Sequence, residues 1–178
     1  MSRSANAVVN FLCRNIPIHL VQVFIDLLPN CSWTALIRGT LAGPFLGICG
    51  KHFLLGSGVI LNQPGKMVVG RNVYIAHYSY VNAAGGLVLN DGVVIGPMCV
   101  LATSNHRREN GRVGNVAESH EINIGSGTWL GAHVTVTAGV RIGSGVVVGA
   151  GSVVTKDLPD NVLAVGAPAR VVRHLSTK

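Results

Sequence analysis

The sequence is poor in charged and aromatic residues. Charged side chains make up 12% of its 178 residues and aromatic side chains 5%. A charge-rich disordered chain and a core built around large rings are therefore both excluded. Acidic residues are the scarcer charged group, seven against 14 Lys and Arg, and the formal net charge is +7. A basic surface suits nucleic acid, anionic lipid or a polyphosphate ligand, and composition does not choose among them.

The sequence also lacks the patterns of a metal or redox site, a secretion signal and a membrane span. Its four cysteines are Cys13, Cys31, Cys49 and Cys99. No two of them are closely spaced, so buried free thiols are expected. Arg14 and Asn15 interrupt the only early apolar run, and no run reaches the roughly 18 apolar residues that a spanning helix needs. These absences indicate a cytoplasmic protein.

Glycine is abundant, at 23 residues, and aliphatic residues recur with a period of six. The unbroken run is Ile124, Leu130, Val136, Ile142, Val148 and Val154. An earlier run, beginning at Val69, keeps the same period, slips by two residues around Gly85-Gly86 and resumes at Leu89. A period of six fits neither a helix nor a strand. It predicts a chain that turns a corner after every short strand, so that three hexads close one triangular coil and coils stack into a solenoid.

The repeat divides the chain into three parts. Residues 46–160 form the predicted solenoid, with a polar insertion at residues 107–121. Residues 1–45 lack the repeat and are expected to form a helical or irregular cap. Residues 161–178 leave the hexads, and we expect them to end in a short helix.

The cap contains a predicted helix from Ile18 to Leu28, whose polar residues His19, Gln22 and Asp26 share one face. Two interpretations are open. The helix packs on the first coil, or it lies on a membrane surface, because basic residues flank apolar sequence at positions 38 and 51. The acidic Asp26 and the scarcity of basic residues on that face argue against the membrane.

His106 ends a hexad immediately before the insertion. A rigid strand therefore delivers an imidazole to the base of a protruding segment, and such segments usually lie on the binding face of a solenoid. Histidine accepts a proton near neutral pH, which makes His106 the candidate general base. Groups that could orient its ring are Glu109, Glu118, Glu121 and a backbone carbonyl.

Several segments resemble the hexapeptide-repeat acyltransferases. Those similar to the galactoside and maltose O-acetyltransferases are Thr103–His106, Ile124–Gly131, Ala150–Asp157 and Gly166–Arg173, while Cys31–Thr34 is similar to the capsule and exopolysaccharide O-acetyltransferases. The resemblance covers about residues 66–174. It implies an all-β solenoid, a left-handed parallel β-helix with an N-terminal helical cap, one protruding loop and a short C-terminal helix. It also implies a homotrimer with active sites shared between subunits.

The same resemblance implies direct transfer of an acetyl group from acetyl-coenzyme A to an acceptor hydroxyl, with His106 taking the proton and no metal required. Trp129 matches a tryptophan beside the acceptor pocket and is grouped with the coenzyme-contacting positions. These are Trp129, Ala132, Ala150, Thr155, Lys156, Arg170 and Arg173. Small side chains leave room for a pantetheine arm, and basic side chains suit its phosphates. Each assignment has a structural alternative. The alanines also suit a tight corner of the coil, Trp129 could be ordinary packing, and the two arginines could be solvated charges of the tail.

The acceptor is specified less closely. Where sugar-acetylating relatives carry an amide and a carboxylate, this chain has Ala76 and Ala84. Asn82 and His77 lie in the same predicted coil and are the candidate substrate-binding residues by location alone. Asn82 also suits a structural role at a corner.

The leading prediction is acetyl-coenzyme A-dependent O-acetylation of a sugar or of a polysaccharide or glycolipid precursor. A weak membrane-surface contact through residues 1–45, at the inner face, stays open. Alternatives are acetylation of an antibiotic or other small acceptor, a non-catalytic scaffold, and a zinc hydratase similar to the β-helical carbonic anhydrases. The zinc site would need His77, His106 and His133 to converge between subunits. No motif indicates nucleic-acid binding.

Overall fold

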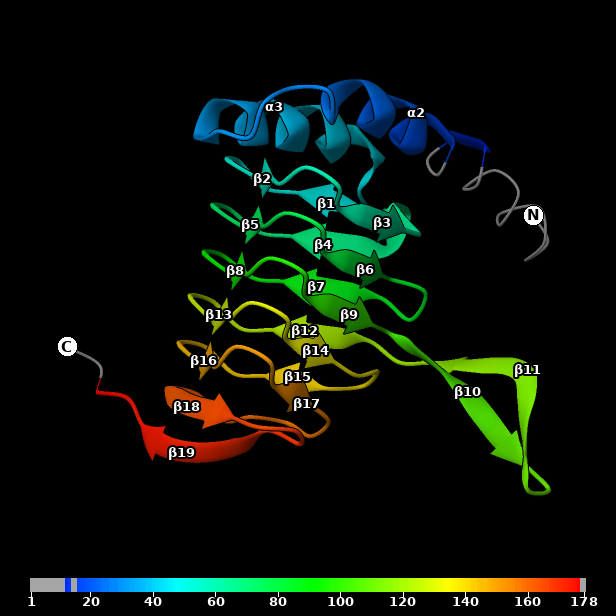
Figure 1. The fold of residues 1–178 in the computed structure, drawn as a ribbon, viewed down its shortest axis with the longest axis vertical. Helices are drawn as coiled ribbons and strands as arrows, with labels where there is room; N and C mark the ends of the chain where they lie inside the picture. The colour runs from blue at the N-terminus through cyan, green and yellow to red at the C-terminus, as the bar shows by residue number, and fades with distance from the viewer. Residues whose placement is uncertain (1–11, 14–15, 177–178) are drawn as a thin grey trace.

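Short strands separated by sharp corners follow the hexads through most of the chain. The computed structural model describes residues 12–13 and 16–176, as a triangular parallel β-solenoid closed at its N-terminal end by two helices (Figure 1). Sheet A holds β1 (Ile48–Cys49), β4 (Met67–Val69), β7 (Leu87–Leu89), β12 (Ile122–Ile124) and β15 (Arg141–Ile142). Sheet C holds β3 (Ile60–Asn62), β6 (Tyr80–Asn82), β9 (Val100–Ala102), β14 (Thr135–Val136) and β17 (Val153–Val154).

Sheet B is the third side of the prism and the longest. It holds β2 (Leu54–Leu55), β5 (Tyr74–Ile75), β8 (Val94–Ile95), β13 (Trp129–Leu130), β16 (Val147–Val148), β18 (Val162–Val165) and β19 (Arg170–His174). The chain visits sheets A, B and C in turn, so each coil has an A–B, a B–C and a C–A corner. This arrangement fits the left-handed β-helix that the resemblance implies.

The predicted hexads are confirmed by burial. Ile124, Leu130 and Val136 are fully buried, and their counterparts one coil later are buried as well. The two-residue slip falls at the C–A corner before β7, where Gly86 adopts a φ of +98° that favours glycine. Because β7 then presents both Leu87 and Leu89 to the core, the register recovers without exposing an aliphatic face.

The cap consists of α2 (Ile16–Ile25) and α3 (Ser32–Ala42), followed by the short 3₁₀ turn η2 (Gly43–Phe45). The helix predicted at Ile18–Leu28 is therefore present with shifted ends, and the sequence analysis did not separate α3 from it. The helices lie across the first coil (Figure 1). No helix in the described part of the chain is long and apolar enough to cross a bilayer.

The expected C-terminal helix is wrong. Arg170–His174 forms β19, which pairs antiparallel with β18, with Val165 opposite Arg170 and Leu163 opposite Arg173. The last parallel strand leaves an open edge, and the β-branched Val171 and Val172 favour the extended conformation that can pair with it.

The insertion leaves the third coil after β9 and is a two-stranded hairpin (Figure 1). It consists of β10 (Ser104–Glu109) and β11 (Arg112–Ser119). The chain then returns to β12, which pairs in register with β7, for example Ile122 with Leu87. The coil ladder therefore continues across the insertion as if the hairpin were absent.

Candidate active site

The hairpin that carries His106 is shaped by its turn and by a bulge. Asn110 and Gly111 connect the strands with φ values of +49° and +79°, the backbone that an Asn-Gly hairpin turn requires. His106 lies opposite Ala117, and the strand register shifts between His106 and Arg108. Such a bulge changes the direction of neighbouring side chains, which is common beside active sites.

The His106 ring is oriented by a backbone carbonyl. Its Nδ1 lies 3.2 Å from the carbonyl oxygen of Gly114 in the facing strand. A carbonyl oxygen only accepts, so the proton of neutral His106 sits on Nδ1 and the Nε2 lone pair remains available. The side chain is exposed. This is the arrangement that a general base needs.

The glutamates considered for this orienting role have other positions. Arg107 Nε lies 3.1 Å from Glu109 Oε1 and 3.3 Å from Glu118 Oε1, so both carboxylates pair with that guanidinium. Glu121 lies beside Gly86 after the hairpin has ended. Of the alternatives left open by the sequence, the backbone carbonyl is therefore the one in contact with His106.

A hollow of about 490 Å³ lies where the hairpin joins the C–A corner. Its lining residues are Asn62, Gln63, Asn82, Ala84, Ser104, Ala117 and Ser119. Opposite residues of an antiparallel pair point to the same face, so His106 lies on the face of Ala117 and, two residues along, of Ser104. The hollow and the candidate base therefore share one side of the hairpin. The sequence analysis missed Ser104 and Ser119. The alternation of side chains between the two faces of a strand could not be used before the insertion was known to be a hairpin.

Asn82 lines this hollow and also has a structural role. Its Nδ2 donates to Ser104 Oγ at 3.0 Å, and its Oδ1 accepts from the backbone N–H of Ala84 at 2.9 Å. One amide hydrogen remains for a ligand. Ala84 leaves the hollow without a carboxylate at that position, whereas Ala76 is buried at the B–C corner of the same coil.

Three of the seven positions implied for coenzyme binding, Trp129, Ala132 and Ala150, lie at or near the B–C corner. Ala132 and Ala150 occupy it in successive coils, joined by a 2.9 Å hydrogen bond from Gly151 N to Ala132 O. Trp129 projects from the outer face of sheet B and is half exposed. His77 belongs to this corner too, and its Nδ1 accepts from the Ser57 backbone N–H at 3.1 Å. The structure thus separates His77 from Asn82 although both lie in one coil.

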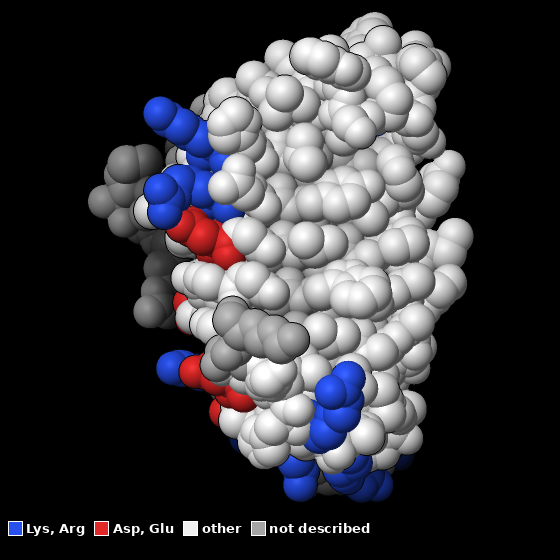
Figure 2. All heavy atoms as spheres, turned by 90° about the vertical axis from the view of Figure 1, so that its left-hand side faces the viewer, with Lys and Arg blue, Asp and Glu red and all other residues white. Residues whose placement is uncertain are grey.

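The basic positions lie toward the C-terminal end. Thr155 and Lys156 follow β17 at the C–A corner and are exposed. Arg170 and Arg173 belong to β19, the outer strand of sheet B, and are exposed as well. Figure 2 shows Lys and Arg gathered at this end and along one edge, with a broad uncharged face between them.

One chain therefore does not bring all the predicted residues together. His106, Asn82 and the hollow lie at the C–A corner, whereas Ala132 and Ala150 lie at the B–C corner and Trp129 lies on sheet B. Among residues 12–13 and 16–176, no group of three His, Cys, Asp or Glu side chains is placed to hold a metal ion.

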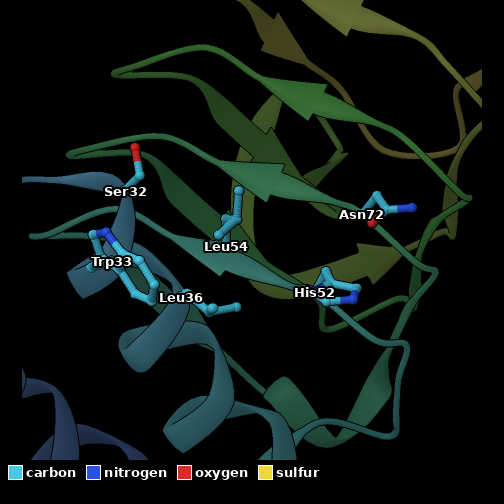
Figure 3. A pocket seen from close by; sticks show the side chains of 6 residues that line it. All are labelled: Ser32, Trp33, Leu36, His52, Leu54 and Asn72. Carbon is cyan, nitrogen blue, oxygen red and sulfur yellow. The ribbon is translucent and has the colours of Figure 1, made fainter.

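A second hollow, of about 460 Å³, lies against the cap rather than near His106. Its wall is formed by Trp33, Leu36 and Leu54, with Ser32, His52 and Asn72 around it (Figure 3). No carboxylate belongs to this lining and half of its residues form the apolar wall, so the hollow suits an apolar group.

Comparison with known proteins agrees with the fold and the repeat. The family described as "Bacterial transferase hexapeptide (six repeats)" matches residues 121–156. A putative acetyltransferase of Saccharomyces cerevisiae is 31% identical over 134 residues, which cover 75% of this chain and 68% of that protein. The chain belongs to the hexapeptide-repeat transferases. This confirms the family expected from the motifs.

Two further relatives of this hexapeptide-repeat transferase bear more specific names. The galactoside O-acetyltransferase of Escherichia coli K12 is 35% identical over 135 residues, covering 70% of this chain and 64% of that enzyme. The solved structure of a galactoside acetyltransferase in complex with coenzyme A is 28% identical, with a TM-score of 0.77, and covers 89% of this chain and 81% of that one. The alignment thus spans about two thirds of the length of the two curated relatives.

Proposed function

We propose that this hexapeptide-repeat transferase moves an acetyl group from acetyl-coenzyme A to a hydroxyl group of a sugar or of a polysaccharide or glycolipid precursor. The observation that carries the proposal is the hydrogen bond between His106 Nδ1 and the Gly114 carbonyl, because it leaves Nε2 free to accept the hydroxyl proton. The galactoside O-acetyltransferase relative and the coenzyme A bound to a related structure support the donor and the reaction.

In the proposed reaction, His106 Nε2 takes the proton as the acceptor oxygen attacks the thioester carbonyl. A new oxygen–carbon bond forms, the carbon–sulfur bond breaks, and the protonated imidazole returns its proton to the leaving sulfur. The Gly114 carbonyl stabilises the imidazolium, since Nδ1 keeps its hydrogen throughout. No acyl-enzyme is needed, so no nucleophilic side chain has to lie in the hollow.

The coenzyme assignment rests on shape and charge. Ala132 and Ala150 keep the B–C corner free of bulky side chains, so a thin pantetheine arm can lie along it. Arg170 and Arg173 bring positive charge to one end of sheet B, and Lys156 lies exposed after β17, the last strand of sheet C. Guanidinium and ammonium groups of this kind suit phosphate oxygens.

We infer that the active site is completed by a second copy of the chain in a homotrimer. The C–A corner with His106 and the B–C corner with the alanines lie apart in one chain, and a neighbouring chain can bring them together. The outward residues of the parallel strands of sheet B, β2 to β18, carry no charge, and Figure 2 shows this part of the face as white. They are Leu54, Tyr74, Val94, Trp129, Val147 and Leu163. A continuous uncharged face of this kind favours subunit association.

The hollow favours a neutral sugar over a cationic antibiotic. Its polar lining is made of the amides Asn62, Gln63 and Asn82 and the hydroxyls of Ser104 and Ser119. Amides and hydroxyls pair with sugar hydroxyl groups, whereas an acceptor rich in ammonium groups requires carboxylates. No carboxylate belongs to this lining among the described residues.

The decisive experiment measures release of the coenzyme A thiol with free sugars, nucleotide sugars and lipid-linked glycans as acceptors. Replacing the base, His106→Ala, is expected to lower kcat by about 10²- to 10⁴-fold without removing coenzyme binding. Ala150→Trp is expected to block coenzyme binding instead. Neither variant alone is expected to be active. In a mixed trimer, a site can combine the intact C–A corner of an Ala150→Trp subunit with the intact B–C corner of a His106→Ala subunit, so mixing should restore part of the activity.

The outcomes separate the two claims. Full activity of His106→Ala would refute the base assignment. A protein that is active as a monomer, or two inactive variants that never complement each other after refolding together, would refute the shared site.

A further inference from the structure

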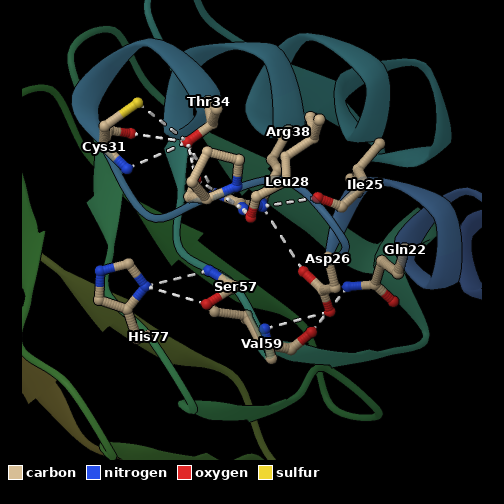
Figure 4. Close-up of polar contacts among 12 residues, drawn as sticks. Gln22, Ile25, Asp26, Leu28, Cys31, Thr34, Arg38, Ser57, Val59 and His77 are labelled. Carbon is tan, nitrogen blue, oxygen red and sulfur yellow. Dashed lines mark hydrogen bonds and ion pairs between the residues drawn. The ribbon is translucent and has the colours of Figure 1, made fainter.

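Of the three polar residues predicted to share one face of the first helix, Gln22 and Asp26 turn toward the first coil, whereas His19 is exposed. Gln22 Nε2 donates to the Val59 carbonyl oxygen at 2.7 Å, and Asp26 Oδ2 accepts from the Gly58 N–H at 3.1 Å (Figure 4). These groups belong to the first coil, which has no preceding coil to pair with. The polar face of α2 therefore saturates backbone groups at the open end of the solenoid, as a sheet edge requires.

Turning the polar side inward leaves the apolar side outward. Val23, Phe24 and Leu27 are among the most exposed apolar residues of α2 and the turn after it, and Trp33, Ile37 and Leu41 extend the surface along α3. We call these six residues the cap face. A helix pair inside a soluble domain normally presents the opposite pattern.

The cap face carries no unpaired charge. Asp26 and Arg38 are the only Asp, Glu, Lys or Arg residues between positions 16 and 46. Arg38 is completely buried and its Nε lies 3.5 Å from Asp26 Oδ1 (Figure 4). The carboxylate that counted against a membrane contact in the sequence is therefore directed into the protein.

Positive charge borders this surface. Lys51 is exposed at the first A–B corner, next to the cap. Figure 2 shows the cap end of the molecule free of charged residues, with Lys and Arg beginning just below it on one edge. An apolar helical surface bordered by basic residues is the pattern of interfacial helices on anionic lipid.

Trp33 and its neighbouring hollow add to this pattern. The exposed indole stands at the start of α3, and tryptophan favours the headgroup level of a bilayer. The hollow of about 460 Å³ beside it has an apolar wall of Trp33, Leu36 and Leu54 (Figure 3). It offers room for part of an apolar lipid chain at the margin of the cap face.

We propose that the cap face docks on the surface of a lipid bilayer that contains anionic headgroups. The solenoid then stands on the membrane with its coil axis directed away from the lipid. The hairpin leaves the third coil, so the first two coils lie between it and the cap. Docking does not depend on the proposed acetyl transfer, because no residue of the candidate active site belongs to the cap face.

The test is flotation of the full chain with vesicles of phosphatidylethanolamine and phosphatidylglycerol, and with vesicles of phosphatidylcholine alone. The double variant Phe24→Glu, Leu27→Glu is expected to lower the partition coefficient at least tenfold. The matched control is Val113→Glu on the hairpin, since Val113 and Phe24 are 69% and 71% exposed. The control and His106→Ala should bind within twofold of the wild type. Circular dichroism verifies that every variant is folded.

A second measurement follows Trp33 directly. Anionic vesicles should shift its fluorescence to shorter wavelength, and Trp33→Phe should abolish the shift although Trp129 remains. Failure of the folded wild type to float with either vesicle would overturn the proposal. So would a lower molecular mass of the double variant in sedimentation with unchanged vesicle binding, because the cap face would then be a protein–protein interface.

Discussion

Replacing Arg38 tests how the cap is fastened. The buried guanidinium donates to the carbonyl oxygens of Ile25 at 3.2 Å and Leu28 at 2.7 Å and to Thr34 Oγ1 at 3.2 Å, and it pairs with Asp26 (Figure 4). One side chain therefore joins the end of α2, the connecting turn and α3. In Arg38→Met the apolar volume is kept, but these acceptors lose their donor.

The expected loss follows from these contacts. Removing one partner of a buried charged network costs about 3–5 kcal/mol. Since the Asp26 side chain is one-third exposed and water can reach it, we expect the lower end, about 3 kcal/mol. For a chain of this size that corresponds to roughly 6–12 °C in Tm. Asp26→Asn should cost only about 1 kcal/mol, because the carbonyl acceptors of Arg38 remain.

Thermal denaturation measures the total effect, and hydrogen exchange locates it. Amides of α2 and α3 should lose protection in Arg38→Met while those of the later coils keep theirs, because each coil contacts only its neighbours. A loss below 1 kcal/mol, or a loss spread evenly over all coils, would refute this account of the cap.

Three further changes test other parts of the chain. Gly39→Ala should prevent α3 from packing on the first coil, because the new Cβ would overlap a backbone carbonyl, and the loss should appear as a lower Tm. Hydrogen bonds from Arg71, first from its backbone N–H, lower the pKa of Asp91. The stabilisation is therefore present at neutral pH and lost as pH falls through that lowered pKa, so the Tm difference between wild type and Asp91→Asn should shrink in acid. The hydrogen bond with Thr34 lowers the pKa of the Cys31 thiol, whereas burial raises the pKa of Cys49 and of Cys99, so iodoacetamide should modify Cys31 before those two cysteines, as peptide mass spectrometry can show.

The solenoid was readable from the sequence because its information is local. Each inward position from Ile124 to Val154 repeats at a fixed distance along the chain, and all of them are buried in the structure. Even the slip after Gly86 was visible, since the period reaches Leu87 and resumes two residues later at Leu89. A period needs no knowledge of which strands pair.

The ends and the insertion were harder to predict, because their conformations depend on distant partners. Val171 and Val172 extend only because β18 leaves an open edge beside them. The inward turn of Asp26 depends on Gly58, more than thirty residues later. The separation of His77 from Asn82 depends on which corner each occupies. The Gly114 carbonyl had no sequence pattern at all, because any residue supplies one.

The register that continues across the hairpin has a consequence for how such proteins diversify. The coils before and after the hairpin pair in register, Leu87 with Ile122 and Leu101 with Val136. The pairing of the coils therefore does not depend on how long the segment between them is. Lengthening a surface excursion costs little free energy, growing only with the logarithm of its length. The hairpin is thus an exchangeable module. Grafting a different hairpin between Thr103 and His120, one that keeps His106 and the Gly114 carbonyl, should alter acceptor choice while the stack beneath it folds unchanged.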